Sequence, residues 1–445
     1  MNKLNKISKN SSKIFLIFLG FVLLLQISNS ILSIFFITIT VILSFVLAHQ
    51  KLKIKNDMMR KNLEKLSVPI CFIILVIFNI FGVIKTLTGT VENQSSVQVI
   101  FVGVTFYLLS AGAYISDNKI IYTRENWVDE FINLYLYLIL PFKLLAGPLE
   151  NPQIINQFNK ISLKLKSTAI SLYSFSWISL GMFMKFCISS RLTPSELLHF
   201  TDPIGSFICA FIFELKFYFD FAGYSFIVYG FARLFNIKLT LNFNHPFTAN
   251  NVVEFWHKWH VSLGKFLQKY ILNKNLAIFN SRITKAIFAS SIFIISAMWH
   301  GGTANYFFWG LFHGLVYLFY IQYFKLKNIP KIIRYFFMFL FFVLGRMIAI
   351  DINTGRLFDK WINFFNYNMY ELFNFNYIKN LFSLGTSTNS VLLILMIFIF
   401  FEFSQVKFKK KNFYHYFRKP LISIMLFLTT ILFGFNSMEL LYARI

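Results

Sequence analysis

Long apolar runs separated by short polar or basic stretches occupy most of the chain. A helix that crosses a membrane needs about 20 mostly apolar residues. By this criterion the sequence predicts membrane spans at about 14–30, 31–48, 68–88, 98–116, 131–149, 168–187, 204–234, 285–299, 304–324, 333–350, 390–404 and 420–437. The pattern therefore indicates an all-α, polytopic membrane protein with about 11 or 12 membrane helices, some of them re-entrant or interfacial.

Three of the polar stretches between the apolar runs are long, and they lie at 188–203, 236–284 and 351–389. The last of these mixes aromatic with polar residues, which is typical of amphipathic helices that lie along the membrane interface. We divide the chain into three parts: N-terminal membrane helices at 1–130, a central segment at 131–325, and C-terminal membrane helices with this interfacial loop at 326–445.

The composition excludes a soluble or a disordered protein. Of the 445 residues, 57% are hydrophobic and 14% are charged, whereas an ordinary soluble domain is about 25% charged. The three cysteines all lie in apolar runs, which suits small buried side chains better than disulfide bridges.

The formal net charge of +25 comes largely from basic clusters between the apolar runs, at 3–13, 51–65 and 407–419. Such clusters mark the cytoplasmic side of membrane proteins and favour anionic lipid. They predict a multi-pass protein of the cell's inner (cytoplasmic) membrane, with its N-terminus inside and the 351–389 loop outside. Nucleic acid is not an expected partner, because no basic groove with interleaved aromatic residues stands outside the predicted spans.

Five of the eight histidines fall between the middle and late spans: His245, His257, His260, His300 and His313. An unpaired polar group in hydrocarbon is costly, so polar residues at membrane depth occur in cavities, in pairs or in functional sites. The concentration of histidines therefore predicts an internal polar cavity.

In the run 254–263, EFWHKWHVSL, Trp256 and Trp259 are three residues apart, as are His257 and His260. On one continuous helix each pair would share a face. The pattern is compatible with an aromatic belt at the membrane interface, in which histidines bind headgroups or carbonyl groups. The H-x-x-H spacing is also found at metal sites, but two histidines alone are a weak signal, so no metal is expected.

His300 ends one apolar run in MWHGG, and His313 lies inside the next in WGLFHG. The two glycines after His300 allow a helix to break, and a broken helix at membrane depth is tolerated beside a cavity. We therefore expect His300 to face an internal cavity. We expect His313 to be a core histidine that is hydrogen-bonded to a neighbouring helix.

Charged residues also occur inside the predicted span 204–234, as Glu214, Lys216 and Asp220. Lys216 and Asp220 are four residues apart, so they can pair on one helical face and reduce the cost of burial. Alternatively, these groups and the histidines form a proton path, as in a proton-coupled transporter or a lipid flippase.

The sequence contains no serine nucleophile elbow, no P-loop and no dinucleotide glycine fingerprint. A neutral imidazole near pH 7 can remove a proton from a hydroxyl group. A buried imidazole can do so while excluding water that would hydrolyse an activated acyl group. The histidine cluster is therefore compatible with acyl transfer.

Four sequence blocks give a more specific indication: PFKLLAGP at 141–148, YFDFAGYS at 218–225, LNFNHPFTANNVVEFWHKWHVSL at 241–263, and MWHGGTANYFFWGLFHG at 298–314. Together they resemble the membrane-bound O-acyltransferase (MBOAT) family, in the bacterial branch that includes alginate O-acetylases and the D-alanyl transfer proteins of teichoic acid. The resemblance implies a multi-helix fold around a central tunnel, with 131–325 as the catalytic core.

The resemblance also implies particular site residues. The histidine of the family's W-H-G block corresponds to His300 and that of its W-H-x-S-L block to His260, which are the implied catalytic residues. The residues implied to bind substrate are Trp259, Ser262, Trp299 and Asn244.

The activity that the resemblance implies is that of an O-acyltransferase without a tightly bound cofactor. Its donor would be acetyl-CoA or another acyl thioester, carried by coenzyme A or by an acyl carrier protein. Its other partners would be membrane lipid, a polysaccharide acceptor and an exported acyltransferase.

Within this branch the sequence favours polysaccharide O-acetylation over D-alanyl transfer. FDFAGYS and NFNHPF are similar to the D-alanyl transfer proteins, but the chain continues well past 314, and Arg346 in LGRMIAI is similar to the F-F-R-A element of alginate-type acetylases. Phe226 and Gln268-Lys269-Tyr270 depart from the acetylase pattern, which often has Asp and Arg-Asp-Tyr there, and leave acceptor and partner open.

Overall fold

A computed structural model of the protein describes residues 2–28, 32–87, 104–117, 127–144, 146–161, 168–301, 303–323, 329–350, 354–366, 375–384 and 419–434. Within these ranges the regular elements are helices, and none of the described residues forms a β-strand. The predicted all-α fold is confirmed.

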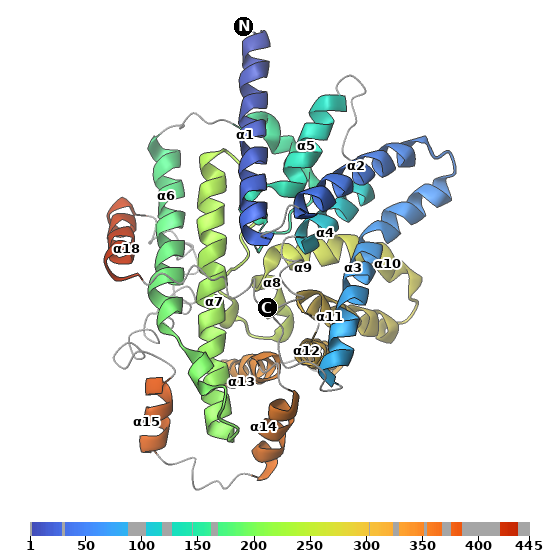
Figure 1. Ribbon diagram of the computed structural model, residues 1–445. Coiled ribbons are helices and arrows are strands. Elements are labelled where there is room, and N and C mark those ends of the chain that lie inside the picture. The colour runs from blue at the N-terminus through green and yellow to red at the C-terminus, as the bar shows by residue number, and fades with distance from the viewer. Residues whose placement is uncertain are drawn as a thin grey trace.

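The described helices fall into three groups along the chain, coloured from blue to red in Figure 1. The first group contains α1 (Asn2–Ser28), α2 (Leu32–Lys53), α3 (Asp57–Leu87), α4 (Val104–Ser116) and α5 (Trp127–Ile139). The central group contains α6 (Thr168–Met182), α7 (Pro203–Leu234), α8 (Val252–Lys258), α9 (Val261–Leu267), α10 (Asn273–Asn275), α11 (Arg282–His300) and α12 (Ala304–Tyr323). The last group contains α13 (Lys331–Ile350), α14 (Thr354–Asn366), α15 (Phe375–Leu384) and α18 (Pro420–Phe433).

Shorter helical turns join or extend these helices. The 3₁₀ segments are Pro141–Lys143, Pro152–Lys160, Ser189–Arg191, Pro194–Leu197, Pro246–Thr248 and Leu276–Ile278. Two π-helical turns, Phe183–Ile188 and Gln268–Leu272, continue α6 and α9 respectively.

Four described helical stretches are long and apolar enough to cross a membrane: Ile34–Lys53 in α2, Ile170–Arg191 in α6 and its continuation, α11, and α13. Shorter apolar helices occur at Ser11–Gln26, Phe106–Ser116 and Pro420–Phe433. The outward face of α2 is apolar, with Phe35 60% and Leu43 54% exposed. Such a face suits lipid rather than water, as expected of a multi-pass membrane protein. The predicted span 390–404 lies outside the described residues.

The predicted span 131–149 is wrong in its second half. α5 ends at Ile139, and Pro141 begins a 3₁₀ turn. Proline lacks an N–H group and disfavours helix at the residue before it, so the helix stops there. Gly147 then adopts a φ of +83°, which glycine reaches without strain. The chain therefore turns at this point instead of continuing as a helix.

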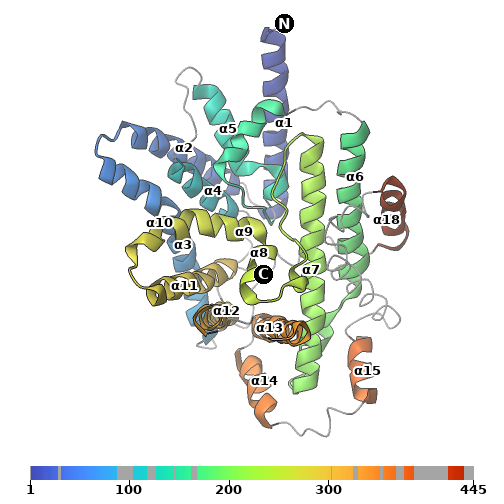
Figure 2. The same ribbon diagram turned by 180° about the vertical axis from the view of Figure 1, so that it is seen from behind.

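α7 lies beside α6 along much of its length, as both views in Figures 1 and 2 show. Its 32 residues extend over about 48 Å at about 1.5 Å per residue. Asp202 caps its N-terminus by accepting a hydrogen bond of 2.8 Å from the Gly205 N–H. At Gly223 a Cβ atom would lie 2.7 Å from the Gly181 carbonyl oxygen, so glycine there lets the two backbones approach closely.

Three charged residues of α7 contact neighbouring segments. Asp220 forms an ion pair with Lys185, in the π-helical turn after α6, and both side chains are 6% exposed. Lys216 donates a hydrogen bond of 2.6 Å to the Leu192 carbonyl oxygen. Each of these side chains therefore has a partner in a neighbouring segment, and the predicted Lys216–Asp220 pair stays a prediction.

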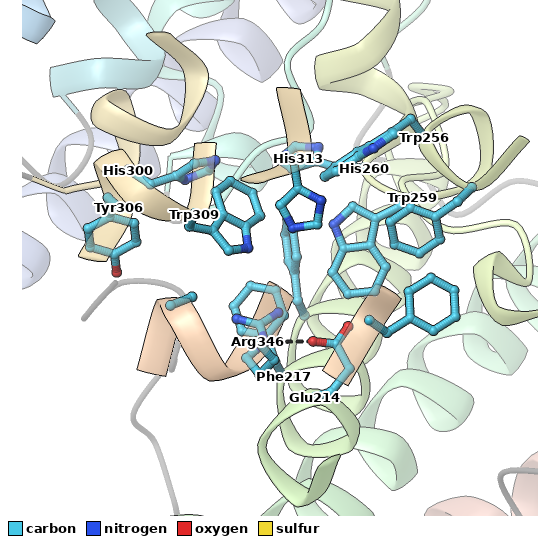
Figure 3. A pocket seen from close by; sticks show the side chains of 14 residues that line it. Glu214, Phe217, Trp256, Trp259, His260, His300, Tyr306, Trp309, His313 and Arg346 are labelled. Atoms are coloured by element: carbon cyan, nitrogen blue, oxygen red, sulfur yellow. Dashed lines mark hydrogen bonds and ion pairs between the residues drawn. The ribbon is translucent and has the colours of Figure 1, made fainter. Parts of the chain in front are cut away.

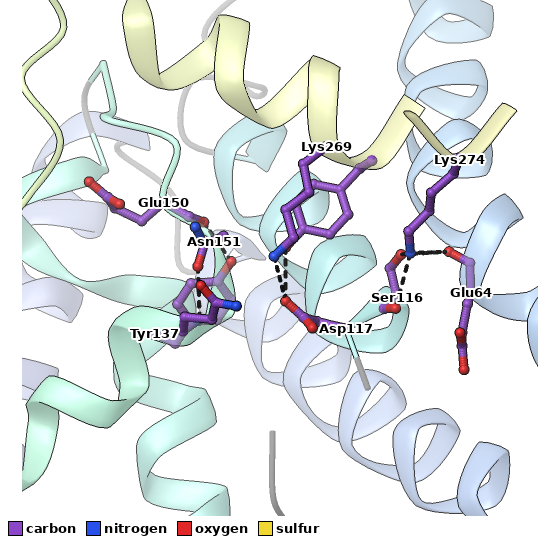
Figure 4. Close-up of polar contacts among 10 residues, drawn as sticks. Glu64, Ser116, Asp117, Tyr137, Glu150, Asn151, Lys269 and Lys274 are labelled. Carbon is purple, nitrogen blue, oxygen red and sulfur yellow. Dashed lines mark hydrogen bonds and ion pairs between the residues drawn. The ribbon is translucent and has the colours of Figure 1, made fainter. Parts of the chain in front are cut away.

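Polar contacts also connect residues 269–274, after α9, to the N-terminal helices (Figure 4). Lys269 pairs with Asp117 at 2.7 Å, and Lys274 donates a hydrogen bond of 2.9 Å to the Glu64 carbonyl oxygen. Tyr270 donates to the same Asp117 carboxylate at 3.3 Å. These contacts fix α9 and α10 relative to α3 and α4.

Replacing Asp220 with asparagine tests the buried ion pair. The change leaves the Lys185 ammonium without its counter-ion, and breaking a buried pair in this way costs about 3–5 kcal/mol. We therefore expect D220N to lower the unfolding temperature of the detergent-purified protein markedly. D57N is the control, because Asp57 pairs with Lys61 at an exposed site, where solvent screens the ion pair and its loss changes stability little. Equal shifts in the two variants would contradict the assigned burial of the Asp220–Lys185 pair.

Candidate active site

The histidine-rich segments meet at a cavity of about 60 Å³. α7, α8, α11, α12, α13 and the connection between α8 and α9 enclose it (Figure 3). Its lining residues are Glu214, Phe217, Phe221, Phe255, Trp256, Trp259, His260, His300, Tyr306, Trp309, His313, Phe342, Arg346 and Ala349. The predicted internal polar cavity is therefore present.

The run 254–263 is not one continuous helix, contrary to the prediction. α8 ends at Lys258, Trp259 is extended, and His260 has φ 44° and ψ 52° before α9 begins. This left-handed conformation is uncommon for a residue other than glycine. Because of the break His260 is buried beside the cavity, whereas His257 is exposed.

Asn242 holds the chain in this broken conformation. Its carbonyl oxygen accepts a hydrogen bond of 2.9 Å from the Val261 N–H. Its side-chain oxygen accepts a longer one of 3.4 Å from the Ser262 N–H, and its amide nitrogen donates to the Ser225 hydroxyl at 3.3 Å. On the other side of the break, the Asn244 N–H donates to the Lys258 carbonyl oxygen at 3.0 Å. The NFN sequence therefore positions His260 through the backbone.

His300 ends α11, and the chain leaves the helix at Gly301. Its imidazole ring packs 4.5 Å from the Trp299 ring and 6.4 Å from the Trp309 ring, measured between ring centroids. In Figure 3 the rings of His300, His313 and His260 lie along one side of the cavity. The expectation that His300 faces an internal cavity is confirmed.

His313 is buried, as predicted, but it lines the cavity and its contacts are aromatic. Its ring lies 4.6 Å from Trp309, 4.8 Å from Phe341 and 5.2 Å from Trp256. Its Nδ1 has no hydrogen-bond partner among the described residues. The predicted hydrogen bond to a neighbouring helix is therefore not found within the described ranges.

An ion pair that the sequence did not predict lies across the cavity from the histidines in Figure 3. The Arg346 Nε atom donates a hydrogen bond of 2.6 Å to Glu214 Oε2, and both side chains are 8% exposed. The guanidinium group also lies 4.3 Å from the centre of the Phe217 ring. The sequence signal that could have indicated a partner is Glu214 itself, a charged residue inside an apolar run.

Three of the six predicted site residues line the cavity: His300, His260 and Trp259. The other three do not line it. Trp299 packs on Phe72 and Phe106, the Ser262 hydroxyl accepts a hydrogen bond from the Leu149 N–H at 3.0 Å, and Asn244 is exposed.

The sequence prediction missed Tyr306 and Trp309, although both belong to the 298–314 block and line the cavity. Both lie in the first two turns of α12, close in the chain to His300 at the end of α11. Within the described residues, no three histidine, cysteine, aspartate or glutamate side chains form a group that could hold a metal ion.

Burial lowers the pKa of His260 to about 3, and the nearby His300 contributes in the same direction. His260 lies between α8 and α9, outside the candidate spans. At pH 7 its imidazole is therefore neutral and a weak proton acceptor. Such a group is better suited to forming a hydrogen bond with a reacting atom than to taking up a proton.

A sequence model of the MBOAT, membrane-bound O-acyltransferase family, matches residues 30–332. The chain belongs to this family. The match confirms the resemblance seen in the four sequence blocks, all of which lie inside it. The cavity residues of α13, namely Phe342, Arg346 and Ala349, lie beyond it.

The curated relatives of this MBOAT protein are named for different acyl groups, acetyl in some and D-alanyl in others. A peptidoglycan O-acetyltransferase of Helicobacter pylori is 31% identical over 200 residues, which cover 42% of this chain and 37% of that protein. A probable alginate O-acetylase of Azotobacter vinelandii is 26% identical over 293 residues, covering 62% and 56%. A teichoic acid D-alanyltransferase of Bacillus subtilis is 25% identical over 232 residues, covering 48% and 58%. The chain thus matches between 37% and 58% of the length of these relatives.

The lowered pKa of His260 predicts how stability depends on pH. An unfolded histidine has a pKa of about 6.5, so between pH 6.5 and 3 the unfolded state binds more protons and stability falls as the pH falls. By pH 5 the loss would be about 2 kcal/mol, at about 1.36 kcal/mol per pH unit. We expect H260N, which cannot titrate, to show a smaller drop in unfolding temperature between pH 7 and pH 5.

H257N is the matched control, because His257 is exposed and lies three residues earlier, in α8. It should keep the wild-type difference between the two pH values. Identical pH dependence in H260N and the wild type would contradict the assigned burial of His260.

Proposed function

We propose that this protein transfers an acyl group, acetyl in the first place, from a cytoplasmic thioester donor to a hydroxyl group of a cell-surface or exported polysaccharide, directly or through a partner acyltransferase. The observation that carries this proposal is that His300 and His260 line the same small cavity. The family and the O-acetyltransferase names of its relatives support it.

In the proposed reaction, His300 is the general base. It accepts the proton of the acceptor hydroxyl as the oxygen attacks the thioester carbonyl carbon. The carbon–sulfur bond then breaks, and the leaving thiolate takes the proton from the imidazolium, which yields an ester and a thiol. His260 orients His300 or donates a hydrogen bond to the developing oxyanion.

A relay mechanism uses the same groups in two steps. An imidazole nitrogen of His300 first attacks the thioester carbonyl carbon, the carbon–sulfur bond breaks, and the leaving thiolate takes the N–H proton of the ring, which yields a thiol and an acyl-imidazole. The acceptor oxygen then attacks the acyl carbon, the carbon–nitrogen bond breaks, and the hydroxyl proton passes to the imidazole, which yields the ester and restores His300. In both routes the aromatic walls of the cavity exclude water that would otherwise hydrolyse the activated acyl group.

The size of the cavity favours a short acyl group. Its volume of about 60 Å³ accommodates about four water molecules at about 15 Å³ each. An acetyl group is of this size, whereas a long fatty acyl chain is several times larger. D-alanine is intermediate, and D-alanyl transfer to teichoic acid from a carrier protein is the second candidate function, favoured by the similarity to the Bacillus subtilis protein.

A proton-coupled transporter or flippase is the alternative from another class. Asp220, the carboxylate that a proton path would use, is held in an ion pair with Lys185. Lys216 is hydrogen-bonded to a backbone carbonyl group. Both groups therefore have structural partners, which favours the enzyme over the transporter.

Replacing His300 with alanine tests the proposed base. General acid–base catalysis contributes about 10²- to 10⁴-fold to a rate, so H300A should reduce acetyl transfer from labelled acetyl-CoA in proteoliposomes by about that factor. H257A, at the exposed histidine, is the control and should retain wild-type transfer. Unchanged transfer in H300A would refute the assignment.

Donor competition tests the acyl group. Because the cavity is small, we expect excess unlabelled acetyl-CoA to suppress labelled transfer and excess palmitoyl-CoA to suppress it little. A charged D-alanyl carrier protein is the third competitor. Strong competition by palmitoyl-CoA would indicate a fatty acyltransferase, and strong competition only by the D-alanyl carrier would favour the second candidate.

A further inference from the structure

The cavity contains a second polar group that the proposed chemistry does not use. This is the Arg346–Glu214 ion pair, which α13 and α7 bring together from positions 132 residues apart. Arg346 lies beyond the segment matched by the family model. Its place in the cavity wall therefore comes from the structure and not from the family match.

The contacts of this pair leave part of each side chain facing the cavity. Among the described residues, Nε of Arg346 and Oε2 of Glu214 form the hydrogen bond between them, and the guanidinium face rests on Phe217. The terminal Nη atoms of Arg346 and the Oε1 atom of Glu214 are not used by these contacts. The pair is therefore held in place while it keeps both donors and an acceptor for a ligand.

The charges of the pair cancel, and this decides what it can bind. An anionic ligand would be attracted by Arg346 and repelled by Glu214. A carbonyl group would use only the donors. A hydroxyl group both accepts and donates, so it can bind the guanidinium and the carboxylate together.

The position of the pair indicates which substrate it meets. In Figure 3 the imidazoles lie on one side of the cavity and the pair on the other. α13 begins with Lys331 and Arg334, which predicts a cytoplasmic start, and Arg346 lies in its last turns. Arg346 is therefore near the predicted outer end of α13, on the side where the acceptor is expected.

We propose that Arg346 and Glu214 form the acceptor subsite, in which they hydrogen-bond the acceptor hydroxyl group of a neutral saccharide and hold that hydroxyl group facing His300, while the rest of the saccharide stays outside the small cavity. This inference rests on the proposed acyl transfer. Arg346 binds the acceptor directly, and Glu214 both accepts a hydrogen bond from its hydroxyl group and positions Arg346.

A binding experiment tests the subsite without acyl transfer. Chitotetraose, a neutral oligosaccharide, is titrated into the full-length protein in lipid nanodiscs, and tryptophan fluorescence is followed. We expect R346K and R346M to weaken binding at least tenfold, because a lysine ammonium does not reproduce the guanidinium fork. R233M is the control, since Arg233 also lies over an aromatic ring, Tyr173, but outside the cavity. It should bind as the wild type does.

Charge preference gives a readout that loss of structure would not produce. E214Q removes the negative charge but keeps the shape of the side chain. We expect it to shift preference from chitotetraose toward trigalacturonate, an acidic oligosaccharide, because the guanidinium charge is no longer balanced. In transfer assays with labelled acetyl-CoA, R346K should raise the KM for chitotetraose at least tenfold and the KM for acetyl-CoA less than twofold.

Several results would overturn the subsite. The first is that the wild type binds no chitotetraose or prefers trigalacturonate. The second is that R346K binds chitotetraose as the wild type does. The third is that R346K changes the KM for acetyl-CoA and leaves the KM for chitotetraose unchanged. If R346M fails to fold, R346K, which keeps the charge, decides the question. If binding depends on Arg346 but no acyl group is transferred, the proposed function fails while the saccharide site stands.

Discussion

Charged side chains in an apolar interior need compensating partners, and this requirement determines how α7 sits among its neighbours. Glu214 pairs with Arg346 of α13, and Asp220 pairs with Lys185 beyond the end of α6. Because the two partners come from different helices, the rotation of α7 about its axis is fixed at two points. That rotation turns the Phe217 face of α7 toward the cavity.

The break between α8 and α9 depends on a local compensation of the same kind. The left-handed backbone conformation of His260 destabilises the folded state by on the order of 1–3 kcal/mol. Each hydrogen bond that Asn242 makes stabilises it by about 1 kcal/mol and so offsets part of this strain. The break allows Trp259 and His260 to face one cavity although they are adjacent in sequence. A regular helix would have pointed them about 100° apart.

The cavity contains two kinds of polar group, and its aromatic walls shield both of them from water. Imidazoles lie along one side and a neutral ion pair along the other, as Figure 3 shows. Electrostatic interactions are stronger in such a low-dielectric setting, so a few fixed groups are sufficient to orient two reactants. The balanced charges of the pair add polarity without adding net charge.

The sequence alone determined the class of fold and part of the site. Run length and composition predicted helices such as α7 and α11, because these are local properties of the chain, and the sequence blocks identified His300, His260 and Trp259. The tertiary structure decided the partners of Asp220 and Glu214, the break at His260, and the positions of Ser262, Trp299 and Asn244 away from the cavity. The physical reason is that helical periodicity reports neighbours three or four residues apart, whereas a buried charge is satisfied by whichever distant segment packs against it.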